Sequence, residues 1–128
     1  MKNLILCLSL TLFSLSVFAF SDYPEGCENF TLEVEPMWIP QMPKYPEKAL
    51  KSGVEGCVLL TFAVTTYGSV KDVSVVHEFP KGKGFAEQAK KAMSRTKYKP
   101  LVKNGEPQVQ ENVQYQFSFR DGVVHKSE

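Results

Sequence analysis

The chain has 128 residues, which is enough for one domain, and its 15 basic and 14 acidic residues give a formal net charge of +1. This balance argues against nucleic acid or a strongly charged surface as a partner. The cysteines and histidines form no CxxC or HExxH motif, and no nucleophile elbow is present, so we expect no metal, no cofactor, no small-molecule substrate and no catalytic residue.

The first residues have the pattern of an export signal. Lys2 precedes an apolar run that ends with Val17-Phe18-Ala19, whose small last residue suits signal peptidase. We therefore expect residues 1–19 to be a signal peptide and the mature chain to lie in the periplasm. The alternative is an uncleaved anchor that faces the periplasm, although a spanning helix needs about 20 apolar residues. Removing Lys2 leaves 14 basic and 14 acidic residues.

Residues 20–40 are expected to be an irregular lead-in, because its prolines do not allow a helix. Two cysteines remain after export, Cys27 and Cys57, and thiols tend to pair in an oxidising compartment. We predict a disulfide that joins the lead-in to the first strand, with Cys57 pointing away from the helices. The alternative is two separate thiols, with Cys57 a small apolar residue of the strand.

The first half of the domain predicts a short helix and a hairpin. A helix is expected over residues 45–53, with Pro46 in its first turn, Gly53 after its end, and Ala49 and Leu50 on its buried side. A strand over residues 57–65 places alternate apolar residues on one face. A turn at residues 66–69 leads into a second strand over residues 70–79, with Val73 and Val75 pointing inward.

The second half predicts a helix and a strand. Residues 85–97 form a helix with an apolar stripe at the 3.6-residue period. Residues 101–107 are expected to be a loop that turns at Asn104-Gly105. Residues 109–119 are expected to be a strand with one apolar face and one polar, solvent-exposed (wet) face. Residues 121–128 are expected to be a loose tail. The apolar residues are Val113, Tyr115, Phe117 and Phe119, and the wet ones are Asn112, Gln114, Gln116 and Ser118. The fold class is therefore α+β, a three-stranded antiparallel sheet with two helices on one face.

Several motifs in register resemble the C-terminal domain of TonB over about residues 41–120. The motifs are Pro43-Lys44-Tyr45-Pro46, Gly53-Val54-Glu55-Gly56, Gly68-Ser69-Val70, Tyr98-Lys99-Pro100 and Asn104-Gly105. The resemblance implies a protein-binding module of TonB-dependent transport, in which a motor complex of the inner membrane is coupled to outer-membrane receptors. It also implies that a receptor segment, the TonB box, adds as a strand to the last strand of the sheet.

The resemblance implies a partner-binding site on the last strand and near Gln41. The expected residues are Gln41, Met42, Asn112, Val113, Gln114, Tyr115, Gln116 and Phe117. The expected partner is a TonB-dependent receptor or another TonB-system protein, and a homodimer is a further possibility. Between Asn112 and Phe119 the strand has no charge and no proline, which indicates an edge kept open for a partner. The alternatives are that residues 30–34 cover this edge or that two copies pair there. A second function remains open, a stand-alone structural or dimerisation module of the envelope.

The chain departs from the family pattern at three places. Met42 and Lys44 flank Pro43 where many members have glutamine, and Thr96 stands where an aromatic residue is frequent. About 24 residues separate Phe20 from Tyr45, a span of at most about 80 Å, whereas TonB proteins have a long proline-rich spacer. We therefore expect that this chain does not transduce energy by itself. Basic residues are numerous around the second helix, and they indicate either a solvated face or contact with an acidic partner or peptidoglycan.

Overall fold

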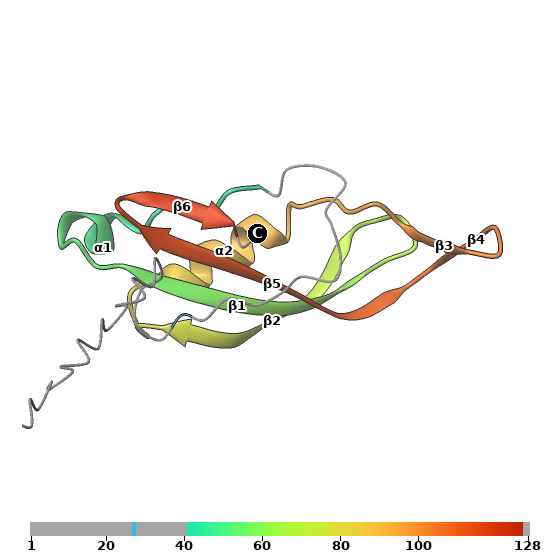
Figure 1. Cartoon of the computed structure of the whole chain (residues 1–128), viewed down its shortest axis with the longest axis horizontal. Coiled ribbons are helices and arrows are strands. Elements are labelled where there is room, and N and C mark those ends of the chain that lie inside the picture. Colours follow the sequence, from blue (N-terminus) through green and yellow to red (C-terminus); the bar gives the residue numbers. More distant parts are fainter. Residues whose placement is uncertain (1–26, 28–40, 127–128) are drawn as a thin grey trace, which may run out of the picture.

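The computed structural model describes residue 27 and residues 41–126, which form an α+β domain. The elements in chain order are α1 (Glu47–Lys51), β1 (Gly56–Val64), β2 (Val70–Phe79), α2 (Phe85–Met93), β3 (Leu101–Lys103), β4 (Glu106–Gln108), β5 (Gln110–Arg120) and β6 (Val123–Lys126). In Figure 1 the sheet runs along the long axis, with α2 against one face and α1 at one end. The hairpin of β3 and β4 extends from the opposite end. None of the helices in the described part of the chain is long and apolar enough to cross a membrane.

The main sheet has four antiparallel strands in the order β2-β1-β5-β6. The three predicted strands are present, and β6 adds a fourth. The expectation of a loose tail after residue 120 was wrong, because Asp121 and Gly122 form a two-residue turn with φ of 51° and 71°. Positive φ at both central residues matches the twist of a tight hairpin, so Val123–Lys126 folds back onto Phe117–Arg120.

The core lies between α2 and one face of β1 and β5. The apolar stripe of α2, formed by Phe85, Ala89 and Met93, packs against alternate residues of both strands, as the periodicity predicts. The ring of Phe85 lies 4.6 Å from that of Phe119, and Tyr45 meets both rings edge-on, at 5.8 and 5.5 Å. The Tyr45 hydroxyl donates a hydrogen bond of 2.6 Å to the carbonyl of Val54. The residues around α1 are thereby joined to the end of the sheet.

Two glycines allow close approaches that fix this packing. A Cβ atom at Gly56 would collide with the carbonyl oxygen of Phe79 and with the ring of Phe85. Gly68 has a φ of 80° in the turn between β1 and β2, where a Cβ atom would collide with the carbonyl oxygen of Tyr98. The amide of Tyr98 donates to the carbonyl of Gly68 at 2.9 Å, so the segment after α2 is held against this turn.

The opposite face of the sheet is also buried near β1 and β5. Cys57, Leu59 and Ala63 are buried there, on the parity opposite to the residues that meet α2. The predicted disulfide between Cys27 and Cys57 is confirmed, with 5.9 Å between the Cα atoms. Gln116, expected to be wet, is only 1% exposed, and Ser118 is buried as well. The expectation of one wet face was therefore wrong for this half of β5. Residues 1–19 and 30–34 lie outside the described residues.

Other differences from the sequence-based expectations are local. Leu50 is 49% exposed rather than buried, and α2 ends at Met93 rather than at residue 97. The turn at Asn104-Gly105 is present, but its flanks are the short strands β3 and β4 instead of a loop. Val75 is 38% exposed although it pairs with the buried Leu60, because β2 lies at the edge of the sheet.

Candidate functional site

The outer side of β5 is the candidate site, and only part of it lies open. β5 pairs with β1 without interruption from Val113 to Phe119, and with β6 over Phe117–Arg120. Among the described residues, the stretch Val113–Tyr115 therefore has a strand neighbour on one side alone. This stretch falls inside the partner-binding segment that the sequence predicts.

The hairpin between β5 and β6 determines which backbone groups face the open side. Arg120 and Val123 flank a two-residue turn and are paired, so they exchange hydrogen bonds with each other. Successive residues of a strand direct their amides to opposite sides, so every second residue before Arg120 faces the same way. Gln114 therefore directs its N–H and C=O away from β1, whereas Tyr115 directs its own toward β1.

A β-bulge ends the regular part of this edge. Phe62 pairs with Val113 and Val64 pairs with Gln110, so Glu111 and Asn112 both lie opposite Ala63. Asn112 adopts a φ of 55°, a conformation that asparagine tolerates better than most residues. A bulge increases the local twist and interrupts the ladder. Asn112 thus lies at the boundary of the open stretch, with β6 at the other boundary.

The side chains of the predicted residues on β5 divide between surface and interior. Those of Asn112 and Gln114 are exposed, while those of Val113, Tyr115, Gln116 and Phe117 are buried. The buried side chains support the strand, so a partner at this edge would meet chiefly backbone groups and the side-chain amide of Gln114. Burial raises the pKa of Tyr115 to about 12. Burial also raises the pKa of Tyr98, and the neighbouring Tyr115 adds a smaller effect in the same direction. Both phenols therefore stay neutral at physiological pH.

Gln41 and Met42 lie against α2. The backbone N–H of Gln41 donates to Thr96 Oγ1 at 3.2 Å, and Thr96 Oγ1 in turn donates to the Ala92 carbonyl at 3.2 Å. Thr96 is buried, and the ring of Tyr98 lies 5.5 Å from that of Phe62. Among the described residues the only hydrogen-bond partner of Gln41 is Thr96. The structure thus places the predicted site residues in two groups, one on β5 and one beside α2.

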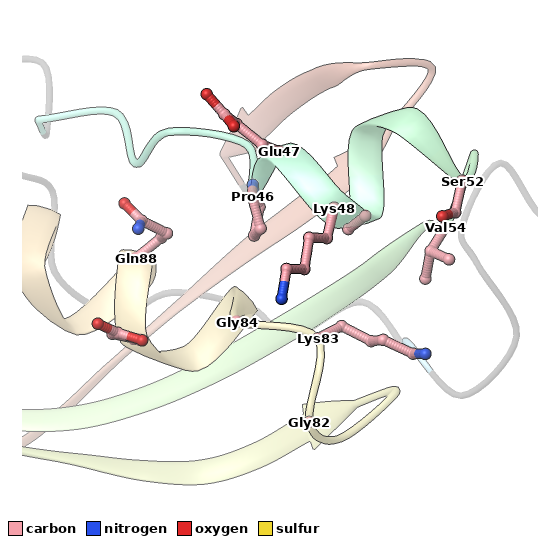
Figure 2. Close-up of a pocket in the computed structure, with 11 residues that line it drawn as sticks. Pro46, Glu47, Lys48, Ser52, Val54, Gly82, Lys83, Gly84 and Gln88 are labelled. Atoms are coloured by element: carbon pink, nitrogen blue, oxygen red, sulfur yellow. The ribbon is translucent and has the colours of Figure 1, made fainter.

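A groove lies between α1 and the beginning of α2 (Figure 2). It has a volume of about 630 Å³, and the ammonium group of Lys48 points into it. Glu47 and Glu87 line it together with Lys48 and Lys83, so its charges cancel. No group of three or more potential metal ligands occurs in the described ranges.

The comparison with known proteins supports the resemblance noted above. Residues 41–120 match the family model described as the C-terminal domain of the Gram-negative bacterial TonB protein. The chain belongs to the TonB C-terminal domain family. It is 31% identical over 82 residues to the protein TonB of Pseudomonas aeruginosa, which corresponds to 64% of this chain and 23% of that protein. The chain therefore spans about a quarter of the length of this curated relative.

Solved structures of TonB domains have the same fold. The TonB2 protein of Vibrio anguillarum superposes with a TM-score of 0.54 at 32% identity, over 79% of this chain and 94% of that one. The solution structure of the Pseudomonas aeruginosa TonB C-terminal domain superposes with a TM-score of 0.51 at 23% identity, over 74% and 85%. The α+β fold expected from the sequence is confirmed, with β6 as the added strand.

Proposed function

We propose that this TonB-family domain is a periplasmic protein-binding module of TonB-dependent transport. In this proposal an extended segment of an outer-membrane receptor, or of another TonB-system protein, adds as a strand beside β5. The open backbone at Gln114 carries the proposal, because strand addition derives its affinity from main-chain hydrogen bonds. Membership of the TonB C-terminal domain family supports the choice of partner.

The boundaries of the open stretch limit how such a partner binds. The bulge at Asn112 lies on one side and the first β6 pair, Phe117 with Lys126, on the other. The open stretch between them, Val113–Tyr115, spans about 10 Å at the rise of a β-strand. A strand of that length makes few main-chain hydrogen bonds, so we expect a weak and reversible complex that suits repeated engagement of a receptor.

Location and cleavage belong to the same proposal. The disulfide between Cys27 and Cys57 is typical of a protein that folds in an oxidising compartment such as the periplasm. We propose that residues 1–19 are removed during export, and that the module acts together with a separate energised partner. The intact mass of protein recovered from the periplasm tests cleavage, since a membrane-bound species that still contains Met1 would indicate an anchor instead.

Photo-crosslinking in living cells tests the partner. A benzoylphenylalanine at position 114 should trap a receptor or a TonB-system protein, which mass spectrometry would identify. The same substitution at Tyr67, which is 89% exposed in the turn between β1 and β2, is the matched control. If position 114 traps only a second copy of this chain, the domain is a dimerisation module and the transport proposal is wrong.

A further inference from the structure

A second, smaller groove lies between residues 41–44 and α2, and we name it the 41–44 groove. It has a volume of about 320 Å³, at the lower end of the range for ligand sites in proteins. Its lining residues are Gln41, Met42, Pro43 and Lys44 on one wall and Gln88, Lys91, Ala92 and Arg95 on the other. The hydrogen bond from Gln41 to Thr96 and the burial of Pro43 hold the two walls together.

Charge distinguishes this groove from the wider one beside α1. All three ionisable residues of its lining are cations, namely Lys44, Lys91 and Arg95, and no carboxylate lines it. The three side chains are exposed, and none forms an ion pair with another residue in the described part of the chain. An uncompensated cluster of this kind attracts an anionic partner and does not stabilise the fold through ion pairs.

The spacing of the cations indicates the shape of that partner. The chain keeps a helical course past Met93, since the Ser94 amide donates to the Lys90 carbonyl at 3.0 Å and the Arg95 amide to the Ala92 carbonyl at 3.1 Å. Lys91 and Arg95 are therefore separated by about 6 Å along the helix axis. Alternate residues of an extended peptide lie on one side, about 6.6 Å apart. Acidic residues at positions i and i+2 of an extended segment thus match the two cations.

The remaining lining residues fit the same occupant. Gln88 lies one turn before Ala92 on the groove wall, and its side-chain amide can both donate to and accept from a peptide backbone. Ala92, on the same wall, has a small side chain that leaves room for the occupant. Met42 is 43% exposed and offers an adaptable apolar surface to the residue between the two acids.

We propose that the 41–44 groove binds an extended acidic segment of a partner protein that carries carboxylates at alternate positions. Lys91 and Arg95 each take one carboxylate, and Lys44 approaches from the opposite wall. The hydrogen-bonded wall at Gln41 is formed before binding, which reduces the entropic cost of association. This site is independent of strand addition at β5.

A titration followed by amide NMR tests the proposal on protein purified from the periplasm after expression of the whole chain. The probe is a capped Ala-Glu-Val-Glu-Ala peptide, and the matched probe is Ala-Gln-Val-Gln-Ala. We expect the acidic peptide to shift the amides of Gln41, Lys91 and Arg95, and the neutral peptide to leave them in place. Equal binding of the two peptides would overturn the proposal, because charge would then not be recognised.

Two triple variants separate the groove from net charge. Lys44→Gln with Lys91→Gln and Arg95→Gln should weaken binding about tenfold, the sum expected for three exposed ion pairs. Lys51→Gln with Lys90→Gln and Lys103→Gln removes the same charge outside the groove and should change binding less than about twofold. Equal weakening by both variants would mean attraction to overall charge, and the groove would not be a site.

Two further measurements exclude other occupants and keep the two proposals apart. Glu33 and Glu35 of this chain have the same alternate spacing. If Glu33→Gln with Glu35→Gln raises the affinity for the probe severalfold, the occupant is the chain's own segment and the proposal is wrong. Tighter binding of a peptidoglycan fragment than of the peptide would also overturn it. Gln114→Pro should leave probe binding unchanged, so a failure of strand addition would not be mistaken for a failure of the groove.

Discussion

β2 and the open stretch of β5 both form an edge of the sheet, and they differ in shape and charge. Both β2 and β5 carry backbone groups directed away from β1, and such groups invite pairing with other chains. β2 has ten residues, two register shifts against β1, a φ of 55° at Asp72 and charged side chains at Lys71 and Glu78. These features twist and charge the edge, which discourages an added strand.

β5 instead is paired with β6 over part of its length and is open only over the short stretch Val113–Tyr115. β6 pairs over Phe117–Arg120 and the bulge at Asn112 ends the regular ladder, so the opening contains neither a charge nor a proline. We infer from this difference that the β2 edge is protected against an added strand, although apolar residues such as Val76 and Phe79 are exposed on it. The stretch around Gln114 is the edge at which we propose that a partner binds. The comparison can be tested by changing one edge at a time.

The largest effect is expected from proline at adjacent positions of β5. Tyr115→Pro removes an amide directed at β1 and a buried ring, so we expect a loss of at least about 4 kcal/mol in the free energy of unfolding. Gln114→Pro removes an amide directed outward, so the domain should stay folded but lose binding to an extended receptor peptide. Urea denaturation and peptide titration measure the two effects. If Gln114→Pro unfolds the domain while Tyr115→Pro does not, the assignment of the open side is inverted.

Breaking the disulfide should weaken both edges at one end. Cys57 pairs with Phe79 of β2 and with Ser118 of β5, and the bridge closes a 30-residue separation. The chain-entropy model gives a loss of about 3–4 kcal/mol when it is removed. Cys27→Ala with Cys57→Ala should speed amide exchange near Phe79 and Ser118 more than near Gln114. Uniform acceleration along β5 would show that the bridge supports the whole fold rather than this end. Iodoacetamide labelling of the denatured wild type provides the control.

Alkaline pH should destabilise the part of the core that supports β5. Burial raises the pKa of Tyr115 to about 12 in the folded state, against about 10 in an unfolded chain. Tyr115 therefore loses its proton at a lower pH in the unfolded chain than in the folded domain. Its contribution to the free energy of unfolding is fully present below pH 10 and is lost as the pH rises toward 12. Tyr115→Phe should flatten this decline in urea denaturation, while Tyr67→Phe, in an exposed turn, should leave it unchanged. A decline as steep in Tyr115→Phe as in the wild type would contradict this origin.

The smallest effect is expected at the bulge. Asn112→Ala places alanine, which tolerates positive φ less well than asparagine, at a φ of 55°. This change should lower the free energy of unfolding by about 1 kcal/mol. Asn112→Gly should change stability by less than about 0.5 kcal/mol, because relief of strain offsets the entropy of glycine. Thermal unfolding compares the two variants, with Glu111→Ala as the neighbouring control. Equal losses for alanine and glycine would mean that the asparagine side chain, and not the backbone conformation, matters here.

Sequence patterns predicted the elements whose signals are local and regular. The alternation of Val113, Tyr115 and Phe117 identified β5, and the stripe that begins at Phe85 identified α2. The disulfide followed from the two cysteines that remain after the expected cleavage. β6 was missed because four residues after an Asp-Gly turn contain too few apolar positions to show a period.

Other features depend on tertiary packing and leave no comparable signal. The burial of Gln116 depends on a second buried face of the sheet, and the exposure of Val75 depends on the position of β2 at the sheet edge. The 41–44 groove forms where residues far apart in the chain meet, Gln41 on one wall and Arg95 on the other. The basic residues of α2 were visible in the sequence, but their convergence with Lys44 was not.

The disulfide also determines how tension would travel through the molecule. A pull applied to the chain before Cys27 reaches the sheet through the sulfur bridge at Cys57, and the covalent loop between the two cysteines carries no load. Helix α1 lies within that loop, so it is shielded from the pull. The load enters β1, which is held by β2 on one side and β5 on the other. Tension directed along β1 loads the hydrogen bonds of both ladders together in shear, whereas a force across the sheet would open them one at a time.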